Sequence, residues 1–110
     1  MRAWLMGYRV LCDPSIRVGH MFRSVRPYNL EWSDTIYNKM RFAMSHFKSE
    51  RISRHLMALS SIPDFGKILL MTLQNGVLER RFTLFNNRIY NDDWFFEKFP
   101  MNEWIGYPAI

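Results

Sequence analysis

A short arginine-rich stretch contains the residues of this chain that are best suited to chemistry. It places His20 directly after a glycine, and Arg23, Arg26 and Tyr28 follow at short intervals. A guanidinium group donates forked, charge-assisted hydrogen bonds that match a phosphate. A neutral imidazole suits manganese, and a glycine before it lets the backbone pass close to a ligand. Two interpretations of His20 stay open here: a metal ligand, or a loop histidine satisfied by local hydrogen bonds.

The other residues that could bind metal do not extend this site. No Cys/His cluster at metal-ligand spacing accompanies His20, so a metal ion bound there must take its other ligands from outside this chain. His46 and His55 fall in helical stretches, where we expect them to be surface or packing residues. The single cysteine, Cys12, excludes an internal disulfide and fits a reducing compartment.

Positive charge is concentrated near the start of the chain. The whole sequence of 110 residues has a formal net charge of +5. Residues 1–30 contain one acidic residue, Asp13, against five arginines: Arg2, Arg9, Arg17, Arg23 and Arg26. This excess favours contact with phosphate groups, and the simpler alternative is a solvated basic edge.

The elements that must position these residues follow from the sequence pattern. Residues 1–5 read as a helix that Gly7 stops, and residues 8–12 read as a short strand that Asp13-Pro14-Ser15 interrupts. Residues 16–30 have no steady period and predict an ordered loop. After Trp32, apolar residues recur at helical spacing, with Ser33, Ser49 and Asp64 near the expected starts. The expected apolar stripes are Ile36, Met40, Ala43 and Phe47; Ile52, Leu56 and Leu59; Phe65, Ile68, Leu69 and Thr72; and Leu78, Phe82, Phe85 and Ile89.

The first 28 residues resemble a known enzyme family. Trp4, Gly7, the run Cys-Asp-Pro-Ser-Ile-Arg-Val-Gly-His-Met-Phe-Arg over residues 12–23, and Pro27-Tyr28 occur in this order. They are similar to the end of the catalytic domain in polypeptide N-acetylgalactosaminyltransferases and their bacterial relatives, which are family 2-type glycosyltransferases of the GT-A fold. The resemblance covers residues 2–28, and the helical remainder matches bacterial members more loosely.

The resemblance implies roles for individual residues. In the family, the histidine of Val-Gly-His binds the catalytic divalent ion, usually Mn²⁺, and this role falls on His20. The arginine and the tyrosine that follow contact the donor diphosphate, which assigns Arg23 and Tyr28. Arg26 stands where the family often has histidine, and it retains the capacity for a phosphate contact. No residue of this chain is assigned as catalytic.

The resemblance also implies how the chain is organised. Residues 1–30 would be the end of a GT-A catalytic core with its metal and diphosphate loop, and residues 31–110 a helical C-terminal extension. The fold class is then mainly α, with one short strand as the remnant of an α/β domain. The family's nucleotide-binding units precede residue 1, so we expect a C-terminal segment that is inactive alone. The complete enzyme would move a sugar from a nucleotide-sugar donor to an acceptor.

The sequence leaves two alternative functions open. A stand-alone basic helical module could bind an acidic partner such as nucleic acid, but no nucleic-acid motif appears, so nucleic acid is not the expected partner. A structural remnant without activity is the other alternative. No apolar run reaches the roughly 20 residues that span a bilayer, and we expect a cytoplasmic protein, free or peripheral to the inner membrane. Aromatic residues make up 16% of the chain, which predicts an exposed apolar face and self-association.

Overall fold

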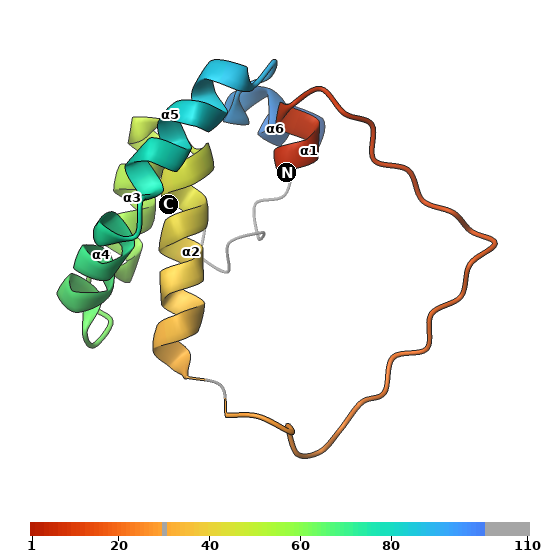
Figure 1. Cartoon of the computed structure of the whole chain (residues 1–110), viewed down its shortest axis with the longest axis horizontal. Coiled ribbons are helices and arrows are strands. Elements are labelled where there is room, and N and C mark those ends of the chain that lie inside the picture. The colour runs from red at the N-terminus through yellow and green to blue at the C-terminus, as the bar shows by residue number, and fades with distance from the viewer. Residues whose placement is uncertain (30, 101–110) are drawn as a thin grey trace.

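The chain is mainly helical, as the sequence predicts. The computed structural model describes residues 1–29 and 31–100. Four longer helices gather into one body, and two short helices lie at its upper edge (Figure 1). The helices are α1 (Arg2–Leu5), α2 (Trp32–His46), α3 (Ser49–Leu59), α4 (Phe65–Gln74), α5 (Val77–Asn87) and α6 (Asp92–Lys98). None of the helices in the described ranges is long and apolar enough to cross a membrane.

The core forms around α2, which α3, α4 and α5 all contact. Ile36 and Met40 of α2 meet Leu59 of α3 and Ile68 of α4 in one buried cluster. This burial confirms the helical stripe expected on α2, because residues spaced by three or four share a face. Each such side chain removed from water contributes roughly 1.5–3 kcal/mol.

Most helix ends lie near their predicted positions. Gly7 follows α1 with a φ of +82°, and Gly76 lies between α4 and α5 with a φ of +71°, so both use backbone conformations that favour glycine. The expected serine caps are wrong. Helices α2 and α3 begin with Glu31 and Lys48 as N-cap residues, neither of which caps the helix through its side chain.

The expected short strand over residues 8–12 does not form. The described part of the chain contains no strand, and these five residues are exposed. Their composition favours a strand, but a strand requires a hydrogen-bonded neighbour, and none of the described segments pairs with this one. The expected turn at Asp13-Pro14-Ser15 does form. The carboxylate of Asp13 accepts hydrogen bonds from the backbone N–H and the hydroxyl of Ser15.

The expected apolar stripe on α5 is also wrong. Leu78, Phe82 and Ile89 are 56%, 71% and 69% exposed. Arg81 of α5 and Arg88, the residue after α5, point inward instead, and their guanidinium groups donate to backbone carbonyls of α2 and of Phe47, which follows α2. Periodicity alone could not show this, because it assigns the buried face to the apolar residues.

Residues 8–29, which we call the arc, sweep outside the helical body between α1 and α2 (Figure 1). The carbonyl oxygen of Leu5 accepts hydrogen bonds from the backbone N–H groups of Ile89 and Tyr90, at 2.9 and 3.0 Å. Leu5 itself is buried, and α1 packs on α6. One end of the arc is therefore held by the connection between α5 and α6, and its other end leads into α2.

Candidate functional site

The four residues predicted to form the site all lie in the arc. His20, Arg23, Arg26 and Tyr28 are exposed, and the ring of His20 contacts that of Phe22 at 4.4 Å between centroids. The hydrogen bonds recorded for the arc are local or reach only to α1. These side chains are therefore accessible to a ligand, and the helical body does not fix their mutual geometry.

A metal ion at His20 would need ligands from elsewhere. Among residues 1–29 and 31–100, no group of three or more His, Cys, Asp or Glu side chains could hold a metal ion. The exposed imidazole of His20 suits a single ligand position. His20 can thus contribute one ligand to a shared site.

Sequence reasoning missed a polar cluster at the end of α2. Arg81 donates to the carbonyl oxygens of Met44 and Phe47 at 2.9 and 2.5 Å, and Arg88 donates to that of His46 at 3.2 Å. Helix ends leave such carbonyls without intrahelical partners, and their partial negative charge attracts cations. Burial lowers the pKa of both guanidinium groups. These arginines serve the fold.

Asp92 connects three elements of the body. It is fully buried, and its Oδ2 accepts hydrogen bonds from the backbone N–H of Lys48, at 2.9 Å, and from Arg51. Its Oδ1 lies 3.9 Å from Arg88. Beside it, hydrogen bonds from the side chains of Lys48 and Arg51 lower the pKa of Asp93. The pair thereby ties the start of α6 to the start of α3 and the end of α5.

The signal for this cluster was present in the sequence. Asn91-Asp92-Asp93 reads as a break, but Asn91 is a helix N-cap whose side chain accepts from the backbone N–H of Trp94, at 2.9 Å. Acidic residues in a first helical turn are typical of helix starts.

His46 and His55 are both 4% exposed, so they are packing residues and not surface residues.

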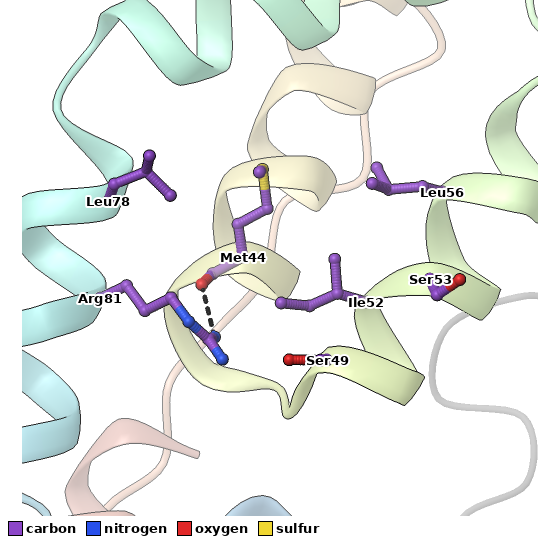
Figure 2. Close-up of a pocket in the computed structure, with 7 residues that line it drawn as sticks. All are labelled: Met44, Ser49, Ile52, Ser53, Leu56, Leu78 and Arg81. Carbon is purple, nitrogen blue, oxygen red and sulfur yellow. Dashed lines mark hydrogen bonds between the residues drawn. The ribbon is translucent and has the colours of Figure 1, made fainter.

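Figure 2 shows a pocket of about 330 Å³ between α2, α3 and α5. Met44, Ile52, Leu56 and Leu78 provide apolar walls, and Arg81 closes one side while bonded to the Met44 carbonyl. The two remaining lining residues are serines, Ser49 and Ser53. The one charged group is already engaged, so this pocket offers no evident chemistry.

Comparison with known proteins gives one informative result. A Caenorhabditis elegans protein named "Probable N-acetylgalactosaminyltransferase 8" is 44% identical over 45 residues, which cover 39% of this chain and 11% of that protein. The similarity is to a glycosyltransferase. This chain thus spans about a tenth of the length of the relative, and its likeness to a glycosyltransferase is partial. No known family profile matches the chain, and no solved structure matches it.

Proposed function

We propose that this chain is the C-terminal segment of a metal-dependent glycosyltransferase that uses a nucleotide-sugar donor. The partial identity to a named N-acetylgalactosaminyltransferase is the observation that carries the proposal. The order of residues 17–28 supports it, because His20, Arg23, Arg26 and Tyr28 lie together in one exposed arc.

Within this proposal, the four candidate site residues of the arc all act on the sugar donor. His20 supplies one ligand to a divalent ion, such as Mn²⁺, whose other ligands come from preceding parts of the enzyme. That ion supplies neutralising charge to the diphosphate leaving group. Arg23 and Arg26 hold the phosphate oxygens through forked hydrogen bonds, and the Tyr28 hydroxyl donates a further one.

The helical body then serves as the scaffold of the arc. It anchors α1 through the Leu5 carbonyl, and α2 receives the chain at the other end of the arc. Acceptor contacts, catalytic groups and most of the nucleotide site belong to other parts of the enzyme. On this account the chain alone transfers no sugar.

Titration of Mn²⁺-dependent binding of uridine diphosphate tests the proposal. The two proteins compared are this chain and the longer protein read in frame from the DNA upstream of Met1. In the longer protein, Arg23→Ala should weaken nucleotide binding by about tenfold or more, since a charge-assisted contact is lost. Arg9→Ala, an exposed arginine of the same arc, is the matched control and should change little.

In this chain alone, Arg23→Ala should not alter the affinity, because the site is incomplete. The proposal fails if Arg23→Ala and Arg9→Ala behave alike in the longer protein. It also fails if the upstream DNA encodes no metal-binding Asp-x-Asp or Asp-x-His segment in frame.

A further inference from the structure

A second pocket of about 330 Å³ is lined by residues of α1, α2 and α5, and its lining is basic. Arginines reach it from three different helices: Arg2 from α1, Arg41 from α2 and Arg80 from α5. The remaining lining residues all belong to α2 and are Asn38, Phe42, Ser45 and His46. No carboxylate of the described residues lines it.

Among residues 1–29 and 31–100, no carboxylate forms an ion pair with the three guanidinium groups at this pocket. The ion pairs of the described residues involve Lys48, Arg51 and Arg88, and none of them includes Arg2, Arg41 or Arg80. Arg41 has the Tyr37 hydroxyl as its hydrogen-bond partner, at 3.5 Å. Gathering three like charges around one hollow costs free energy, which a bound anion would recover.

Ser45 provides an independent observation at the same place. It is 2% exposed, and its hydroxyl oxygen is buried without a hydrogen-bond partner among the described residues. A buried polar atom left unpaired costs about 1–3 kcal/mol. Ser45 lines the pocket, and a small movement of its side chain would bring this hydroxyl within reach of an acceptor oxygen bound there.

His46 lines the same pocket. It is 4% exposed, and its ring packs on Phe42 at 5.1 Å between centroids. Burial is the main reason that its pKa falls to about 4. The secondary reason is positive charge, from Arg2, the amino terminus, Arg88 and Arg80.

We propose that this basic pocket binds a phosphate-class anion, namely the phosphoryl oxygens of a phosphate or diphosphate. Three arginine forks and a buried hydroxyl around one hollow match the several acceptor oxygens of such a group better than the two of a carboxylate. The inference does not depend on the proposed function. Its residues lie on the helical body, whereas Arg23, Arg26 and Tyr28 lie in the arc.

Calorimetric titration of this chain with pyrophosphate, at low and at moderate salt, tests the inference. Arg41→Gln combined with Arg80→Gln should weaken binding by about tenfold for each arginine removed. Arg54→Gln, an exposed arginine of α3 outside the pocket, is the matched control and should leave the affinity unchanged. Arg23→Ala should also leave it unchanged, which separates this site from the arc.

Two further measurements separate binding from folding. Ser45→Ala should weaken pyrophosphate binding several-fold without lowering the melting temperature, because it removes a hydroxyl that is unpaired in the free protein. Saturating pyrophosphate should raise the pKa of His46, followed by its ring resonances, because an anion offsets the surrounding positive charge.

Comparing ligands identifies the source of the phosphate. Tighter binding of uridine diphosphate than of pyrophosphate would indicate a nucleotide, and equal binding a free anion. Acetate should bind far more weakly than either. The inference is overturned if pyrophosphate does not bind at millimolar concentration, or if Arg54→Gln reduces affinity as much as the pocket variant does.

Discussion

The arc and the cluster at the end of α2 use arginine in opposite ways. In the arc, Arg23 and Arg26 are exposed. In the body, Arg81 and Arg88 are partly buried and donate to the end of α2, and both guanidinium groups stack on Phe85, at 3.9 and 3.4 Å from its ring centre. An arginine that is hydrogen-bonded within the protein stabilises the fold, whereas an exposed arginine without such bonds is available to a ligand.

The largest expected effect concerns the centre of the body. Asp92→Ala leaves Arg51 and Arg88 without their buried carboxylate and should lower the free energy of unfolding by roughly 3–5 kcal/mol. Urea denaturation measures this loss. Asp34→Ala, an exposed acid in the first turn of α2, is the control and should cost at most about 1 kcal/mol. Equal losses in the two variants would show that Asp92 does not organise the body.

The next effect is a dependence of stability on pH. The pKa of His46 is about 4 in the folded chain and 6.5 ordinarily, so the unfolded chain takes up more protons between these values. Stability is therefore full above pH 6.5 and falls as the pH drops to 4, by up to about 3 kcal/mol. Burial lowers the pKa of His55 in the same direction.

Thermal unfolding between pH 7 and pH 4 measures this dependence. His46→Gln should reduce the slope of the profile, and the buried His55 accounts for the slope that remains. A flat profile in the unmodified chain would mean that His46 is not buried in the neutral form.

A smaller effect distinguishes two glycines. An added Cβ at Gly7 would lie 2.6 Å from Cδ1 of Ile89, at a φ of +82°, while one at Gly19 would meet nothing within 4 Å. Gly7→Ala should cost about 1–2 kcal/mol through backbone strain and the clash, and Gly19→Ala should cost almost nothing. Chemical denaturation of both variants compares them directly. A larger loss at Gly19 would place the arc within the folded core.

The comparison also shows what the sequence could predict. Glycines at Gly7 and Gly76 marked helix ends because their required backbone conformation is a local property. The strand over residues 8–12 was wrong because pairing depends on a neighbour that the pattern does not contain. The predicted apolar stripe on α5 was wrong because Arg81 and Arg88 face inward, where they donate hydrogen bonds to carbonyl oxygens of α2. The sequence pattern of α5 does not contain these acceptors.

The candidate site also separates what is local in the sequence from what depends on distant residues. Its residues could be found together because they are neighbours in sequence, and all four lie in one exposed segment. Their mutual geometry could not be derived, because the hydrogen bonds of the described residues do not connect the four side chains to the helical body. Whether His20 binds a metal ion stays a prediction.

The smallest effect on folding is expected at the exposed apolar surface of α4 and α5. Leu70, Leu78 and Phe82 are 56%, 56% and 71% exposed, and we expect them to drive self-association. Phe82→Ser should change stability by no more than about 0.5 kcal/mol while reducing association. Sedimentation velocity at rising concentration measures the association of the unmodified chain and of the Phe82→Ser variant. An unmodified chain that stays monomeric at high concentration would contradict this expectation.

The most direct test of the proposed function replaces His20 by Ala in the longer protein read in frame from upstream of Met1 and measures Mn²⁺ affinity, sugar transfer and thermal stability together. If the arc acts on the donor and the body acts as scaffold, manganese affinity and transfer should fall by about tenfold or more, with the melting temperature unchanged. Arg9→Ala should alter none of the three. Unchanged manganese affinity and transfer in His20→Ala would contradict the account, because His20 would then be an ordinary loop histidine.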